Sequence, residues 1–106
     1  MRFSPDQIYA QLISAGEEWS DKDAAWFALD DASKSVLSQI MLRFEGSVAS
    51  RETQALASKE YEDHRLKLKN ARREANLAKV KWLSVQVLAE LRRTEAATRR
   101  AEMKLA

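Results

Sequence analysis

Histidine and its acidic neighbours are the residues of this sequence whose types could bind a metal ion. His64 is the only histidine, Asp63 precedes it directly, and Glu60 lies one helical turn earlier. A protein metal site needs about four donors, and the chain contains no cysteine that could supply a thiolate. We therefore expect no metal and no other cofactor, and we interpret His64 as a surface histidine paired with the carboxylate four residues before it.

Serine hydroxyls are the candidate nucleophiles, but their positions do not suit catalysis. Ser33, Ser35 and Ser38 fall inside a predicted helix, where a hydroxyl lacks the strained turn that carries many hydrolase nucleophiles. The two glycines, Gly16 and Gly46, are isolated, so no glycine-rich loop is available to bind phosphate. The sequence therefore predicts that the protein is not an enzyme.

Basic side chains form the sharpest candidate binding surface. Residues 65–106 contain twelve Lys and Arg against four Glu, a balance of +8, whereas residues 1–31 contain seven acidic residues against two basic ones, a balance of −5. Such asymmetry suits a nucleic acid or another acidic partner. The residues that would contact this partner are Arg65, Lys69, Arg72, Arg73, Lys79, Arg92, Arg93, Arg99 and Arg100.

Glutamates interrupt this basic row, and few aromatic residues lie within it. The acidic N-terminal segment offers a different partner for the basic residues, either within the same chain or across a dimer. We favour this second interpretation, in which the basic face is solvated or paired with acidic groups of the protein itself.

The elements that position these residues are predicted to be helices, because two glycines and one proline in 106 residues permit few turns. Ser4 and Gln7 form a capping box, with a proline between them, that starts a helix over residues 5–18. Ser20 and the acids that follow it start a second helix over residues 21–45.

The rest of the chain is expected to form one long helix. Gly46 would end the second helix in a left-handed cap. Ser50 would then start a helix over residues 51–106, and Ser58 provides a second cap at which this helix could bend. All three helices belong to a single predicted domain, residues 1–106.

The stretch after Ser58 contains neither glycine nor proline, and at 1.5 Å per residue it would be roughly 70 Å long. Its residues 77–91 are apolar nearly all round, so several faces require cover. The two preceding helices can cover some of these faces, and the remaining face requires another chain. Apolar residues recur at a seven-residue interval, at Tyr61, Leu68, Ala75, Trp82, Ala89, Ala96 and Met103.

Two features disfavour a strict two-stranded coiled coil. Positions four residues after the heptad positions are often charged, and Leu66, Leu77 and Leu88 add an eleven-residue interval. We therefore predict an all-α fold in which two N-terminal helices pack on a very long C-terminal helix, and two copies form an elongated, bundle-like dimer. Its core or dimer interface would contain Tyr61, Leu68, Ala75, Leu77, Trp82, Val85, Leu88 and Leu91.

No apolar run approaches the eighteen or so residues that span a bilayer, so we expect no membrane partner. No charged, apolar and small-residue leader precedes the first helix signal. The sequence therefore predicts a cytoplasmic protein.

Three segments resemble small all-helical proteins encoded by bacteriophages and prophages. They are residues 57–61, 71–78 and 91–103, with the sequences ASKEY, ARREANLA and LRRTEAATRRAEM. The proteins that they resemble are accessory factors of the phage recombination and replication region. The resemblance implies a similar role in the cytoplasm of a host bacterium, and it carries over no functional residue.

Three functions are compatible with these features. The first is a non-enzymatic phage accessory protein that binds phage or host proteins, or DNA, in recombination or in countering a host system. The second is a direct nucleic-acid-binding protein that uses the basic face of the long helix. The third is a coiled-coil scaffold component of a virion. We favour the first, because the long helix and the charge asymmetry indicate binding and no catalytic grouping is present.

Overall fold

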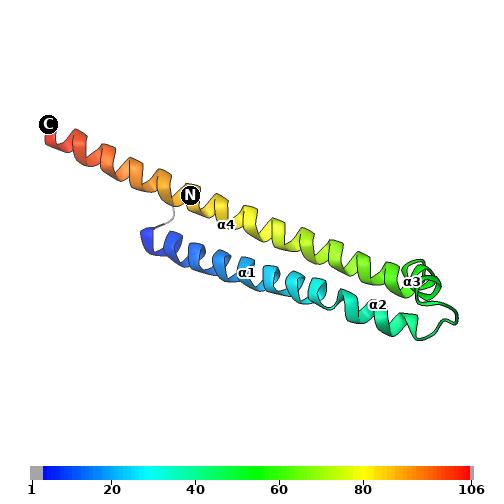
Figure 1. Cartoon of the computed structure of the whole chain (residues 1–106). Coiled ribbons are helices and arrows are strands. Elements are labelled where there is room, and N and C mark those ends of the chain that lie inside the picture. Colours follow the sequence, from blue (N-terminus) through cyan, green and yellow to red (C-terminus); the bar gives the residue numbers. More distant parts are fainter. Residues whose placement is uncertain (1–3, 106) are drawn as a thin grey trace. The chain divides into compact units, whose positions relative to one another are not determined.

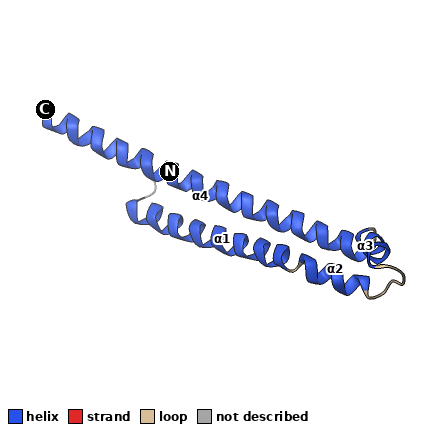
Figure 2. Cartoon of the chain, viewed as in Figure 1, coloured by secondary structure: helices blue, strands red, loops and turns tan. Residues whose placement is uncertain are grey.

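The structure is a computed structural model that describes residues 4–105. Every regular element in that range is a helix (Figure 2). The helices are α1 (Pro5–Asp31), α2 (Ser33–Met41), α3 (Val48–Leu56) and α4 (Lys59–Leu105). The predicted all-α class, with N-terminal helices packed against a very long C-terminal helix, is confirmed.

The chain divides into two compact units. The terminal unit contains residues 1–20 and 76–106, and the central unit contains residues 21–75. In each unit, a segment of the N-terminal helices lies beside a segment of α4 and runs in the opposite direction (Figure 1). The central unit also contains α3, which packs against α2.

The central unit is held together by residues that alternate at intervals of three and four, the spacing of a coiled coil. On α4 they are Tyr61, His64, Leu68, Ala71 and Ala75, all buried or half-buried. On α1 and α2 they are Lys22, Trp26, Leu29, Ser33, Val36 and Ile40, which are likewise buried or half-buried. In this set the residues on α4 include the small Ala71 and Ala75, and those on α1 include the large Trp26 and Leu29.

Two tryptophans form the centre of the terminal unit. The ring centroids of Trp19 and Trp82 lie 5.3 Å apart. Gly16 faces the same indole, because a Cβ atom on Gly16 would lie 3.3 Å from Nε1 of Trp82. Beside this contact, Nζ of Lys81 lies 2.9 Å from a carboxylate oxygen of Glu18. The α4 residues that share this side of the helix are Ala78, Trp82, Val85, Ala89 and Arg92, which are buried or half-buried.

The first helix starts where the sequence predicted. The backbone N–H of Gln7 donates to Ser4 Oγ at 3.2 Å, and the N–H of Ser4 donates to Oε1 of Gln7 at 2.8 Å. The predicted end of this helix at residue 18 is wrong, because α1 continues to Asp31 and Ser20 lies inside it. The contact of Gly16 with Trp82 offsets the cost of a glycine within a helix, which is about 1 kcal/mol.

The interruption lies instead at Ala32, between α1 and α2. Ser33 Oγ donates to the carbonyl oxygen of Leu29 at 3.3 Å. Side-chain bonds of this kind to the carbonyl four residues earlier bend helices. The predicted helix over residues 21–45 is therefore shared between two helices, and α2 ends at Met41.

The connection to the long helix also differs from the prediction. Gly46 has a φ angle of 118°, the left-handed region that favours glycine, but it lies in a bend five residues beyond the end of α2. Ser47, rather than Ser50, caps the next helix by accepting the N–H of Ser50 at 3.1 Å.

Residues 51–106 do not form one helix. The short helix α3 ends at Leu56, and Ser58 then caps α4 by accepting the N–H of Tyr61 at 3.3 Å. The chain therefore breaks at the position where the sequence allowed a bend. The predicted end of the helix at residue 106 lies outside the described residues.

Candidate functional site

His64 is buried, with 7% of its surface accessible, so the prediction of a surface histidine is wrong. Its Nε2 atom lies 2.9 Å from Ser33 Oγ, and the two side chains form a hydrogen bond between α2 and α4. Glu60, the predicted partner of His64, instead accepts a hydrogen bond from Nη1 of Arg43 at 2.7 Å. His64 is thus a structural residue of the central unit. Among residues 4–105, no three His, Cys, Asp or Glu residues are grouped so that they could hold a metal.

Two basic residues of the central unit that were predicted to bind a partner instead contact other residues of the chain. The guanidinium of Arg72 lies 4.4 Å from the ring centroid of Trp26. Nη2 of Arg65 donates to the carbonyl oxygen of Leu56 at 2.7 Å, and its guanidinium also lies over the ring of Tyr61. Lys69 and Arg73 are exposed on the same segment of α4.

The predicted basic contacts of the terminal unit fall into two groups. Lys79 lies 5.8 Å from the ring centroid of Trp19, and Nη1 of Arg92 lies 3.4 Å from a carboxylate oxygen of Glu95. The second group is exposed, and it contains Arg93, Arg99 and Arg100. Part of the positive charge of α4 is therefore used in contacts within the chain.

Acidic residues from the N-terminal segment meet few of these cations. Glu18 of α1 pairs with Lys81 of α4, as the charge asymmetry suggested. In the second pair the charges are reversed, because Lys22 of α1 lies 3.0 Å from Glu74 of α4. These pairs are exposed, and exposed ion pairs contribute little to stability. Trp26 and Trp19 of α1 lie under Arg72 and Lys79 of α4, so aromatic rings as well as carboxylates contact the cations of this helix.

Five large apolar side chains between residues 77 and 91 of α4 are exposed on one side of the helix, and we call this surface the outer face. They are Leu77, Val80, Leu83, Val87 and Leu91, with 54%, 59%, 42%, 55% and 57% of their surface accessible. A rotation of 100° per residue places them on the side of α4 opposite to the residues that contact α1. The outer face is an apolar surface that no described residue of the chain covers.

The predicted core or interface residues are divided between the two sides of α4. Six of them are buried or half-buried on the side that packs within its unit: Tyr61, Leu68, Ala75, Trp82, Val85 and Leu88. The other two, Leu77 and Leu91, belong to the outer face. The predicted interface therefore contained two members of the outer face but not Val80, Leu83 and Val87. The signal that would have found them is the spacing of three and four residues that starts at Leu77.

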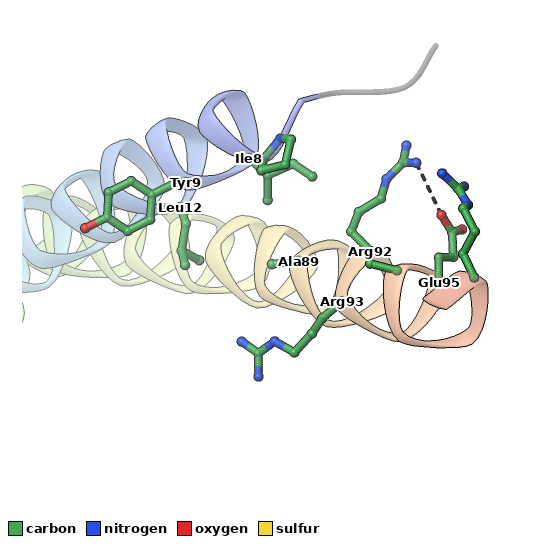
Figure 3. Close-up of a pocket in the computed structure, with 10 residues that line it drawn as sticks. Ile8, Tyr9, Leu12, Ala89, Arg92, Arg93 and Glu95 are labelled. Atoms are coloured by element: carbon green, nitrogen blue, oxygen red, sulfur yellow. Dashed lines mark hydrogen bonds and ion pairs between the residues drawn. The ribbon is translucent and has the colours of Figure 1, made fainter. Parts of the chain in front are cut away.

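A pocket of about 500 Å³ lies where α1 begins beside α4 in the terminal unit, and we call it the arginine pocket. Figure 3 shows Ile8 and Leu12 of α1 pointing toward α4, with Arg92 and Glu95 beside them. Its lining residues are Pro5, Ile8, Tyr9, Leu12, Ala89, Arg92, Arg93, Glu95, Ala96 and Arg99. The three arginines were among the predicted binding residues, but the sequence contains no signal that would bring Ile8, Tyr9 and Leu12 to them.

No helix in the described part of the chain is both long and apolar enough to cross a membrane. No family model matches the sequence, and neither a curated protein nor a solved structure is similar to it.

Proposed function

We propose that the protein is a non-enzymatic binding protein that acts through protein contacts, and that it functions as a homodimer paired through the outer face of α4. The observation that supports this proposal is the exposure of five large apolar side chains on one face of one helix. Contiguous apolar surface of this kind marks protein interaction sites. Leucine and valine at coiled-coil spacing suit a helix as the partner.

The spacing of the outer face is nearly symmetric about Ser84. Leu77 lies seven residues before Ser84 and Leu91 lies seven residues after it. Val80 lies four residues before Ser84 and Val87 three residues after it. In an antiparallel pair, a two-fold axis through Ser84 would therefore bring Leu77 of each copy against Leu91 of its partner. Such self-complementarity is what a two-fold interface requires.

Serine at the centre of the face also favours close approach of two helices. Its side chain is small, and Ser84 Oγ donates to the carbonyl oxygen of Val80 at 2.9 Å, so the hydroxyl is already satisfied within α4. Half-burial of a leucine or valine contributes about 1 kcal/mol. Five such residues per copy offset the entropy of association. We therefore expect dimers at roughly micromolar concentrations.

Sedimentation equilibrium between about 1 and 100 μM tests the proposal. The wild-type chain is expected to sediment as a dimer, and Val87→Asp as a monomer, because a carboxylate would be buried without a partner. Val48→Asp is the matched control, because Val48 is 63% exposed on α3 and lies outside the outer face. A monomeric wild-type chain, or equal effects of the two substitutions, would contradict the proposal.

Cysteine cross-linking tests the antiparallel arrangement separately. A mixture of Leu77→Cys and Leu91→Cys chains is expected to form mixed disulfides, because the two positions meet across the axis. Neither variant alone is expected to cross-link. Disulfides formed by Leu77→Cys alone would show a parallel pair and overturn the antiparallel arrangement, while leaving dimerisation itself to the sedimentation result.

A further inference from the structure

We propose that the arginine pocket binds a short acidic segment of a partner protein, with an apolar side chain of that segment on the pocket floor and a carboxylate against Arg99. The pocket lies within the terminal unit of a single chain. It therefore does not depend on the pairing of two copies through the outer face of α4.

The floor of the pocket is apolar. Ile8 is buried, with 4% of its surface accessible, and Leu12 and Ala89 are half-buried beside it. Tyr9 lies at the rim with 65% of its surface accessible. Figure 3 shows that Ile8 and Leu12 point from α1 toward α4, whereas the side chain of Arg93 points away from α1. An apolar side chain that enters from solvent would cover the surface that Leu12 and Ala89 still expose and remove it from water.

The positive charge of the lining favours a carboxylate as the second recognised group of the ligand. Three arginines and one glutamate line the pocket, and Arg92 is paired with Glu95 at 3.4 Å. Arg99 is exposed, and among the described residues it has no ion pair or side-chain hydrogen bond. A guanidinium binds a carboxylate through two parallel N–H···O bonds, so Arg99 is suited to an Asp or Glu of the ligand.

The openness of the pocket favours a peptide segment over a free small molecule. Six of the ten lining residues are exposed, among them Tyr9, Ala96 and Arg99. Pockets that bind small molecules tightly bury most of the ligand surface, which this pocket would not do. A segment of a larger partner needs to bury only one side chain here, because the rest of its surface can contact α4 around the pocket.

Selection from a display library of random linear heptapeptides tests the proposal, with the wild-type chain as bait. We expect enriched peptides that combine Asp or Glu with Leu, Ile or Phe. The affinity of the most enriched peptide, labelled with a dye, is then measured by fluorescence anisotropy. Arg99→Glu is expected to weaken it at least tenfold, and Tyr9→Ala severalfold. Both positions are exposed, so neither substitution is expected to unfold the chain.

Arg100→Glu is the matched control, because Arg100 adjoins Arg99, is equally exposed, carries the same charge and does not line the pocket. It is expected to change the affinity less than twofold. The monomeric Val87→Asp variant is expected to keep peptide binding, which separates this result from the test of dimerisation. No enrichment, or equal losses for Arg99→Glu and Arg100→Glu, would overturn the proposal. Tighter binding of dodecanoate than of any peptide would assign the pocket to a free amphiphile and overturn it as well.

Discussion

At the scale of single residues, Gly16 shows why a residue that normally ends helices can lie inside one. Its missing side chain admits the indole of Trp82, with Nε1 3.3 Å and Cδ1 3.4 Å from the position of a Cβ atom. The ring of Trp19 completes the contact. The sequence predicted that this helix ends at residue 18, two residues after the glycine, because the tryptophan that covers Gly16 lies 66 residues later in the chain.

This contact predicts that Gly16→Val destabilises the protein by about 2 kcal/mol, the usual cost of overpacking a filled contact. Urea unfolding followed by far-UV circular dichroism measures the change. Ser14→Val is the control, because Ser14 is exposed on the same helix. In a Trp82→Ala background the cost of Gly16→Val is expected to shrink, and an unchanged cost would show that Trp82 is not the cause.

His64 illustrates a second limit of sequence reasoning at this scale. The acidic residues near it in the sequence suggested a surface pair, but its hydrogen bond is to Ser33, 31 positions away. The same bond, with the one from Ser33 Oγ to the carbonyl oxygen of Leu29, places the Ser33 hydroxyl in the contact between α2 and α4. Neighbours in the sequence were the wrong guide for both residues, because the antiparallel arrangement of α2 and α4 creates the contact.

At the scale of elements, the heptad positions from Tyr61 to Ala89 are buried or half-buried in the structure, but the sequence did not indicate the second set of inward positions. The inward positions lie three residues after each heptad residue, at His64, Ala71, Ala78 and Val85. The positions four residues after were considered instead, and their charges argued against a coiled coil. Capping chemistry predicted the start of α1 at Ser4 and the break at Ser58, because these bonds are local.

The first turn of α4 predicts a pH dependence that involves Glu60. The pKa of Glu60 is lowered below 4.5, and the main cause is a hydrogen bond from its own backbone N–H. The positive charge of Arg43 and hydrogen bonds from Arg43 and Ser58 lower the pKa further, whereas burial raises it. A lowered pKa means that the carboxylate stabilises the fold above the unfolded-state pKa, and that this contribution is lost as the pH falls through the folded-state value.

The wild-type chain is therefore expected to be more stable than Glu60→Gln at pH 7, and the difference is expected to shrink as the pH falls below about 4.5. Thermal unfolding between pH 3 and pH 7 measures it. In an Arg43→Gln background the same comparison is expected to give a smaller difference. A difference that is constant over this pH range would contradict the role assigned to Glu60.

At the scale of the whole molecule, the N-terminal helices cover only part of the length of α4. Residues 97–105 of α4 are all exposed, and no helix in the described part of the chain packs on them. Helical segments without tertiary packing are only marginally stable in water. The sequence anticipated this division, because apolar residues thin out after Leu91, but it could not show which side of α4 the N-terminal helices cover.

Hydrogen exchange measured by mass spectrometry is expected to show this difference directly. Amides of residues 97–105 should exchange much faster than those of residues 61–92, whose inward side chains are covered. The monomeric Val87→Asp variant is the appropriate sample, because a second copy could cover part of this segment. Equal protection of the two segments in that variant would show that the end of α4 has a partner within its own chain.

The placement of the three tryptophans has a spectroscopic consequence. Trp19 and Trp82 lie in the terminal unit, and Trp26 stacks under Arg72 in the central unit. Two indoles 5.3 Å apart should couple electronically and give a near-UV dichroism signal that reports only on the terminal unit. In a variant that lacks Trp19 and Trp82, the fluorescence of Trp26 would report only on the central unit, because its surroundings there determine how strongly it is quenched. The protein thus carries its own optical label for each unit, and the order in which the two units open can be followed without adding a dye.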